Sequence, residues 1–193
     1  MNAPPKIRTF IAIDLPDHVR TMLARIQEQL KTEVSGITWT PPQNIHLTLK
    51  FPGYVLQEDL AGLEKAVSAA ASCVRPFELC TAKIGAFPGL NRPRVIWVGV
   101  AGNTVDLNTL YQGVEDRMAS AGFEKEDKKF AGHLTIGRVK GKAKIDPVQM
   151  VEGIGRIKMP VPEHFFVDRI VVYRSDLRST GAVYTELFHK ALA

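Results

Sequence analysis

The sequence predicts a mixed protein of helices and strands, of the α+β or α/β type, built from two similar halves. Segments with helical periodicity alternate with strand-like segments along the whole chain. Their order repeats: a helix beginning near residue 17 precedes HLTL at 46–49, and a helix beginning near residue 105 precedes HLTI at 133–136. We infer a duplicated unit whose copies pack about a pseudo-twofold axis, with equivalent strands side by side or across a groove.

The first half opens with the apolar run IRTFIAI, which is typical of a buried strand. Asp14 to Asp17 then supplies capping residues for an amphipathic helix with the stripe Leu23, Ile26 and Leu30. Trp39 lies in a short extended piece that a Pro-Pro pair ends. The elements expected here are a strand at 7–13, a helix at 17–33, a strand at 45–51, a helix at about 57–73 and a strand at 77–87.

The second half follows the loop PGLNRP. Gly122 is a typical helix end, Pro147 suits a first helical position, and a turn with Ser179 and Gly181 joins the last two strands. No linker interrupts the pattern, so we expect one domain over residues 1–193. The elements expected in this half are a strand at 94–100, a helix at 104–120, a strand at 129–139, a short helix from 146, and strands at 165–174 and 182–191.

Composition indicates a soluble globular protein. The 193 residues are enough to bury a core without a partner, so we expect a monomer. Apolar residues make up 45% of the chain and charged residues 23%. No segment approaches the roughly 18 apolar residues of a membrane span, and Asp14 interrupts the N-terminal apolar run. We expect neither a signal peptide nor a membrane anchor, and a cytoplasmic location.

The charge pattern suits a polyanionic partner such as RNA. The formal net charge is +5, and basic residues cluster in RPR (92–94), EKEDKK (124–129) and KGKAK (140–144). A solvated face explains EKEDKK equally well, because its acids cancel much of its charge. Cys73 and Cys80 lack the spacing of a zinc or redox pair, and we interpret both as buried or incidental.

The doubled motif is the main functional signal. The composition predicts roughly 0.3 chance occurrences of His-x-Thr, and the sequence contains two, in matching contexts. On a strand, His46 and Thr48 project to one face while Leu47 and Leu49 project into the core, and the second copy behaves alike. Two such strands about a twofold axis would bring two imidazoles and two hydroxyls to one cleft.

This set of groups matches the needs of acid–base attack at phosphorus. A neutral imidazole takes a proton from the nucleophile, an imidazolium protonates the leaving oxygen, and hydroxyls hold the phosphate oxygens. The scheme needs no metal ion, and a zinc site would lack a third and fourth ligand. His18, His164 and His189 have no Thr two residues on, so we expect surface or packing roles for them.

The paired motifs resemble those of the two-histidine (2H) phosphoesterase superfamily. More closely, the chain is similar to its bacterial and archaeal RNA 2′,3′-cyclic phosphodiesterases, historically called 2′-5′ RNA ligases. The segments that carry the resemblance are RTFIAIDLP (8–16), WTPPQNIHLTLKF (39–51), FPGLNRPRVIWVGV (87–100), HLTIGRV (133–139) and VVYRSDL (171–177).

The resemblance implies a bilobal α+β fold with antiparallel sheets, outer helices and a central cleft. It implies hydrolysis of an RNA-terminal 2′,3′-cyclic phosphate to a 2′-phosphate, without a cofactor. His46 would be the proton donor to the leaving 3′ oxygen, and His133 the acceptor that activates water. Thr48, Thr135 and Arg138 would bind the phosphate. The sequence alone does not orient the two histidines, because the halves are nearly symmetric.

For the residues after each motif, the question is which face of the strand they occupy. The resemblance points to Arg138 as a phosphate contact and to Phe51 as a base-stacking surface, yet both stand five positions after a histidine. A regular strand would turn both away from the cleft and would turn Lys50 toward it. Gly137 could host a bulge that reverses Arg138, and nothing comparable precedes Phe51. Gly132 and Pro52-Gly53 depart from the family pattern and affect loop geometry.

Two other functions fit the same residues. The site could act on small cyclic nucleotides or 2′-5′-linked oligonucleotides, and its groups also allow the reverse ligation. A non-catalytic RNA-binding protein is the third interpretation, supported by the basic runs at 92–94 and 140–144. Two proton-transfer groups with matching hydroxyls favour catalysis, since binding alone does not require them.

Overall fold

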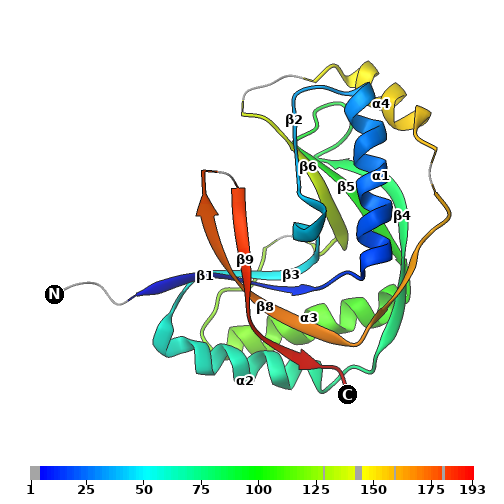
Figure 1. The fold of residues 1–193 in the computed structure, drawn as a ribbon. Helices are drawn as coiled ribbons and strands as arrows, with labels where there is room; N and C mark the ends of the chain where they lie inside the picture. The colour runs from blue at the N-terminus through cyan, green and yellow to red at the C-terminus, as the bar shows by residue number, and fades with distance from the viewer. Residues whose placement is uncertain (1–4, 128, 142–144, 159, 180) are drawn as a thin grey trace.

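The computed structural model describes residues 5–127, 129–141, 145–158, 160–179 and 181–193. It is an α+β fold in which one curled antiparallel sheet carries helices on its outer faces (Figure 1). The strands are β1 (Lys6–Ile13), β2 (Ile37–Trp39), β3 (Leu47–Leu56), β4 (Phe77–Phe87), β5 (Val95–Gly102), β6 (His133–Val139), β7 (His164–Val167), β8 (Arg169–Arg178) and β9 (Gly181–Ala191). The helices are α1 (Asp17–Glu33), α2 (Leu60–Ala71), α3 (Thr104–Ser120) and α4 (Pro147–Arg156).

The two motif strands lie side by side at the centre of the sheet. The strand order is β7-β4-β5-β6-β3-β1-β8-β9, with β2 paired to β6. β3 and β6 pair antiparallel through Leu47 and Leu134, which hold the same position in the two motifs. The expected pseudo-twofold arrangement of equivalent strands is therefore confirmed, and this pairing joins the sheets of the two lobes into one.

The lobes exchange strands between the two repeats. β4 follows the first motif in the chain but pairs with β5, whereas β8 follows the second motif and pairs with β1. The first lobe thus consists of β3, β1, β8 and β9, and the second of β6, β5, β4 and β7. Because each lobe contains a strand from the other repeat, neither repeat can complete its sheet alone.

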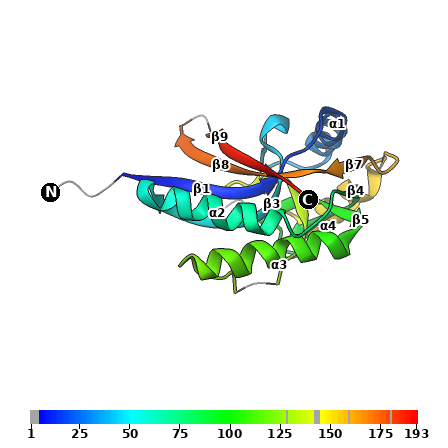
Figure 2. The same ribbon diagram turned by 90° about the horizontal axis from the view of Figure 1, so that it is seen from below.

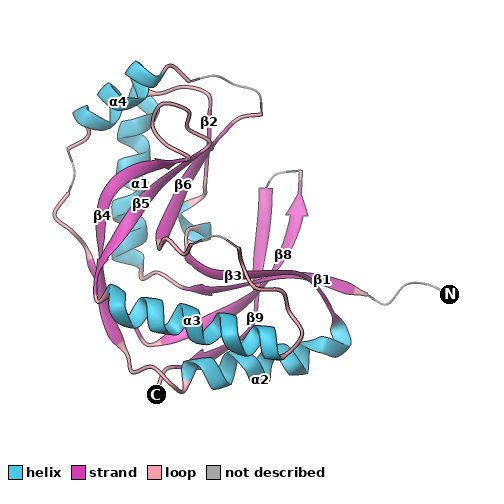
Figure 3. Cartoon of the chain, turned by 180° about the vertical axis from the view of Figure 1, so that it is seen from behind, coloured by secondary structure: helices cyan, strands magenta, loops and turns pink. Residues whose placement is uncertain are grey.

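Helices cover the outer face of each lobe. In Figure 3, α2 and α3 run side by side under β1 and β3, and α1 and α4 flank β4, β5 and β6. Figure 2 shows the same α2–α3 pair from below. The predicted stripe of Leu23, Ile26 and Leu30 is fully buried in the core. The amphipathic pattern therefore identified the packing face of α1 correctly.

Several boundaries differ from the sequence expectation for identifiable reasons. The strand expected at 165–174 is divided at Asp168, because β7 pairs with β4 while β8 pairs with β1. β6 begins only at His133, and the preceding Phe130 instead stacks on Tyr111 of α3. Of the two cysteines expected to be buried or incidental, Cys73 is exposed and Cys80 is half-buried.

Candidate active site

His46 is held in a defined orientation just before β3. Its Nδ1 lies 2.9 Å from the carbonyl oxygen of Asn44. A carbonyl can only accept, so Nδ1 carries the proton and donates it, which leaves the Nε2 lone pair for a ligand. The ring stacks on Phe10 with centroids 4.5 Å apart, and Tyr184 meets both rings edge-on. His46 is thus positioned by packing as well as by a hydrogen bond.

His133 repeats this arrangement in the second lobe. Its Nδ1 lies 2.7 Å from the carbonyl oxygen of Ala131, again two residues earlier, so the same tautomer is imposed. Its ring meets Phe87 edge-on at 4.9 Å and Trp97 at 6.4 Å. Both motifs therefore leave Nε2 as the unprotonated ring nitrogen.

A β-bulge follows each motif at the equivalent position. Thr48 pairs with Ala12 and Lys50 with Ile11, so Leu49 is an extra residue in β3. Thr135 pairs with Trp97 and Gly137 with Ile96, so Ile136 is an extra residue in β6. A bulge reverses the alternation of the residues that follow it. It therefore turns the fifth residue after each histidine to the cleft face.

The bulges determine which residues after each motif face the cleft. Arg138 is exposed on the cleft side, and Gly137 leaves room for Ile37 and Trp39, which a β-carbon there would approach to 2.7 and 3.1 Å. Phe51 also faces the cleft, with its ring centroid 5.8 Å from that of Phe10. The expectation that no bulge precedes Phe51 was wrong, because Leu49 provides one.

Lys50 adjoins the cavity that Thr48 and His133 line, but it is buried in an ion pair and is not exposed on the cleft face as the sequence predicted. Its side chain is 2% exposed, and its Nζ lies 2.7 Å from Oε1 of Glu115 on α3. Nζ also donates to the carbonyl of Glu124 at 2.7 Å, while Oε2 of Glu115 accepts from the backbone N–H of Glu126 at 2.9 Å. The buried pair therefore links the first motif strand to the loop that leads to the second motif.

Gln27 of α1 stabilises the bulge in β6. Its side chain is buried, and its Nε2 donates to the carbonyl of Ile136 at 2.8 Å and to that of Thr40 at 2.7 Å. A bulged residue loses a regular ladder partner, so a buried donor at this point satisfies a carbonyl that would otherwise be costly. The helix thereby helps to fix the direction of Arg138.

The surroundings of both histidines favour the neutral imidazole. Burial lowers the pKa of His46 from 6.5 to about 4, and the positive charges of Arg20 and Arg138 act in the same direction, against the Asn44 hydrogen bond and Asp14. Burial also lowers the pKa of His133, again assisted by Arg138. One guanidinium thus lowers the pKa of both imidazoles, in keeping with the cleft-facing direction that the bulge gives Arg138.

A cavity confirms that the two motifs meet. It measures about 430 Å³, and Thr48 of the first motif and His133 of the second both line it. Aromatic side chains of Phe51, Phe87 and Phe130 supply much of its wall. Thr135 is half-buried on β6, opposite Trp97.

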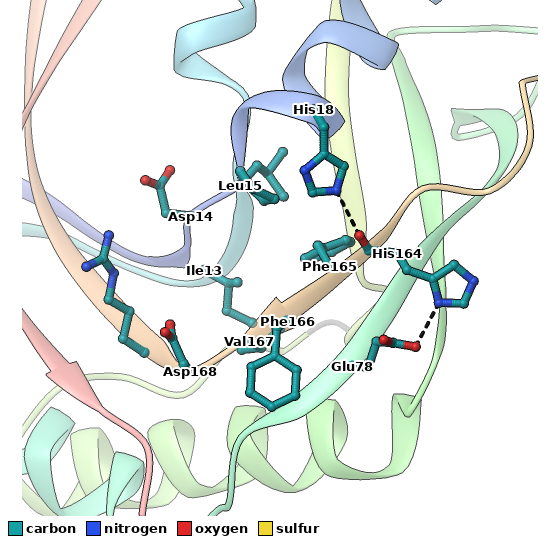
Figure 4. A pocket seen from close by; sticks show the side chains of 12 residues that line it. Ile13, Asp14, Leu15, His18, Glu78, His164, Phe165, Phe166, Val167 and Asp168 are labelled. Carbon is teal, nitrogen blue, oxygen red and sulfur yellow. Dashed lines mark hydrogen bonds and ion pairs between the residues drawn. The ribbon is translucent and has the colours of Figure 1, made fainter.

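A second cavity, of about 600 Å³, contains no motif residue (Figure 4). There His18 Nε2 lies 2.8 Å from the carbonyl of His164, and His164 Nδ1 lies 2.7 Å from Glu78 Oε1. His189 contacts Glu186 elsewhere. All three non-motif histidines are exposed, as expected for surface residues.

The aromatic neighbours of the histidines were not identified from the sequence. Phe10 and Trp97 are 87 residues apart, the same separation as His46 and His133. They occupy β1 and β5, and each contacts the histidine of the neighbouring motif strand. Extending the repeat spacing back to the preceding strands would have found this pair. Tyr184, on β9, has no such signal.

The described residues lack two features. No helix there is long and apolar enough to cross a membrane. No group of three or more His, Cys, Asp or Glu side chains in the described ranges has a metal-binding arrangement.

A duplicated α+β fold in which each half brings an imidazole and a hydroxyl to one cleft defines a two-histidine phosphoesterase. Comparison with known families is more specific: the model of the LigT-like phosphoesterases matches residues 13–97 and again 98–184. This chain therefore belongs to the LigT-like phosphoesterase family. Two consecutive matches to one family model are expected for a chain with two similar halves.

Known relatives extend over nearly the whole chain. A Thermotoga maritima protein named RNA 2′,3′-cyclic phosphodiesterase is 35% identical over 182 residues, covering 94% of each chain. A protein of the same name from Methanothermobacter thermautotrophicus is 32% identical over 94% of this chain and 97% of its own. A solved Thermus thermophilus structure has a TM-score of 0.78 at 27% identity, covering 96% of this chain and 98% of its own. E. coli LigT, solved with 3′-AMP, shares the fold, with a TM-score of 0.74 at 22% identity over 98% of this chain and 99% of its own.

Proposed function

We propose that this enzyme hydrolyses the 2′,3′-cyclic phosphate at the end of an RNA and leaves a 2′-phosphate. The observation that carries the proposal is the matched pair of histidines, each with Nδ1 bonded to a carbonyl and Nε2 available. Arg138 influences both rings. Relatives that match most of the chain carry the name of this activity.

The reaction divides its two proton transfers between the histidines. Nε2 of His133 takes a proton from water as the water oxygen forms a bond to phosphorus, and the bond from phosphorus to the 3′ oxygen breaks. Protonated Nε2 of His46 gives its proton to the departing 3′ oxygen. The family resemblance supports this assignment of donor and acceptor. These transfers need no metal ion in the proposed mechanism.

Substrate binding prepares His46 for its role. With a pKa of about 4, His46 is largely neutral in the free enzyme near neutral pH. An anionic cyclic phosphate beside the ring favours the imidazolium and offsets the charge of Arg138. The acid form of His46 is therefore created mainly when substrate is bound.

The remaining polar groups stabilise the phosphate. Hydroxyls of Thr48 and Thr135 donate to its non-bridging oxygens, and Arg138 adds a charged donor from the cleft side. Phe51 is 49% exposed and offers its ring to the terminal base. If a 5′-hydroxyl takes the place of water, the same groups form a 2′-5′ bond, which is the reverse ligation.

The test uses a short RNA that ends in a 2′,3′-cyclic phosphate, assayed in EDTA, with the product identified by mass and by its resistance to a 3′-phosphatase. We expect catalytic turnover to a 2′-phosphate. Stoichiometric binding without product would instead support the RNA-binding interpretation. Comparable kcat/KM values on a 2′-5′-linked dinucleotide would change the assigned substrate while leaving the site in place.

A further inference from the structure

Positive charge is concentrated in two segments that form neighbouring strands. Residues 79–105 and 128–145 contain nine lysines and arginines and no aspartate or glutamate. The whole chain has a net charge of +5, so the rest of the chain is net negative. The two segments supply β5, β6 and most of β4, which are adjacent in the second lobe. β6, which carries His133, and its neighbour β5 therefore contain no acidic residue.

Arg94, just before β5, is hydrogen-bonded to the residues at and after the end of β6. The carbonyl of Arg94 accepts from the backbone N–H of Val139 at 3.0 Å, and Nη1 of Arg94 donates to the carbonyl of Gly141 at 3.2 Å. These bonds tie the loop before β5, which carries Arg92, to the end of β6. Arg92, Arg94 and Lys140 are all exposed. We call these three residues the basic rim.

The basic rim continues directly into the active site. Arg138, whose charge acts on both histidines, pairs in register with Val95, the residue after Arg94. Arg138 and the basic rim thus place cations from the reacting phosphate outward, and residues 88–102 and 133–141, which carry them, contain no aspartate or glutamate. A phosphodiester chain leaving the site in this direction would meet one cation after another.

Aromatic rings lie between the rim and His133. Trp97 and Phe87 are half-buried and contact each other with centroids 5.1 Å apart. The indole lies flat against Gly85, where a β-carbon would come within 2.3 Å of the ring. Aromatic surfaces beside a track of cations are the usual features of single-stranded nucleic-acid sites.

We propose that the basic rim binds the RNA strand that leads to the terminal cyclic phosphate, so that the enzyme prefers RNA ends to cyclic mononucleotides. The proposal rests on the proposed function, because it places the strand relative to that reaction. The rim binds backbone phosphates, which makes the preference independent of base sequence and sensitive to salt.

The test compares a cyclic mononucleotide with an octanucleotide that ends in a 2′,3′-cyclic phosphate, across a range of NaCl concentrations. The variant Arg92→Ser/Arg94→Ser/Lys140→Ser removes the rim and leaves Arg138 in place. We expect its kcat/KM on the octanucleotide at low salt to fall about ten- to hundred-fold, and the salt slope to weaken by about 0.7 for each phosphate that the variant no longer neutralises. Its kcat/KM on the mononucleotide should stay within about twofold of wild type, because the reacting groups are unchanged.

A matched control removes three exposed cations elsewhere, in Lys65→Ser/Arg75→Ser/Lys158→Ser. It changes net charge equally and should leave the preference for RNA intact. The variant Arg92→Ser/Lys140→Ser retains the Arg94–Gly141 bond and should show a smaller loss even if the triple variant folds poorly.

The outcomes separate this inference from the proposed function. Hydrolysis of both substrates with equal kcat/KM and no salt dependence would show that the basic rim does not bind the RNA strand. The phosphodiesterase assignment would remain intact. An equal loss of octanucleotide activity in the control variant would also overturn it. Hydrolysis of neither substrate by the wild-type enzyme would overturn the proposed function itself.

Discussion

Burial of His46 should make the folded protein sensitive to acid. Its pKa falls from 6.5 to about 4 on folding, chiefly because the ring is buried against its aromatic neighbours. The folded-state pKa is the lower one, so the unfolded chain binds more protons between these values and stability declines as pH falls from 6.5 toward 4. At about 1.4 kcal/mol for each pKa unit, His46 accounts for a loss on the order of 3 kcal/mol.

The variant His46→Asn isolates this effect. Asparagine does not titrate, and its side-chain amide can still donate to the carbonyl of Asn44 in place of Nδ1. Urea unfolding of both proteins at a series of pH values from 7.5 to 4.5, at fixed ionic strength, gives the free energy of unfolding. We expect the wild-type value to fall more steeply than that of the variant. Replacing the exposed His189 by Asn serves as the control.

Parallel pH dependences for wild type and His46→Asn would refute this reasoning. They would mean that His46 is as easily protonated in the folded protein as in the unfolded chain. The proposed preparation of His46 by the bound phosphate would then be unnecessary.

Three further predictions concern the site and its support. Because burial lowers the pKa of both His46 and His133, the bell-shaped profile of kcat/KM against pH should have its maximum below pH 6.5; a maximum above 7 would contradict the electrostatics of the free enzyme. Arg138→Gln removes a positive charge that lowers the pKa of His46 and of His133, so both limbs of the profile should move to higher pH and KM should rise. An unchanged profile would mean that the guanidinium does not act on the two histidines. Lys50→Met leaves Glu115 buried without its partner and should cost about 3–5 kcal/mol in urea unfolding, whereas Lys50→Met/Glu115→Leu should recover most of it; equal losses in the two variants would contradict this account.

The sequence was most informative where a local pattern decides the structure. Period-two alternation correctly placed Leu47 and Leu134 in the core, and helical periodicity identified the buried face of α1. The repeat also predicted that the motif strands would lie side by side or across a groove near a twofold axis, and the structure shows the first of these arrangements.

The bulges were harder to predict, because they depend on how a strand pairs rather than on its composition. Leu49 and Ile136 are ordinary strand residues, and only the register with β1 and β5 shows them to be extra. One unseen bulge reversed the expected directions of both Lys50 and Phe51. The ion pair with Glu115 was equally hidden, since it joins residues 65 positions apart in the chain.

The exchange of strands between the repeats could not be predicted from the sequence patterns either. Alternation predicts that 77–87 and 165–174 are strands but does not say which partner each one takes. The partner change at Asp168 splits the second of these into β7 and β8. The exchange brings an aromatic side chain into each lobe: Tyr173 of β8 stacks on Phe10, and Phe87 of β4 meets His133 edge-on.

The central claim is that His46 and His133 act together in one reaction, and kinetics of single and double variants test it most directly. With an RNA 2′,3′-cyclic phosphate in EDTA, His46→Ala and His133→Ala should each lower kcat by about a hundred- to ten-thousand-fold. Because both groups serve the same step, the double variant should lose much less than the product of the two single losses. Near wild-type turnover in either single variant would contradict the account.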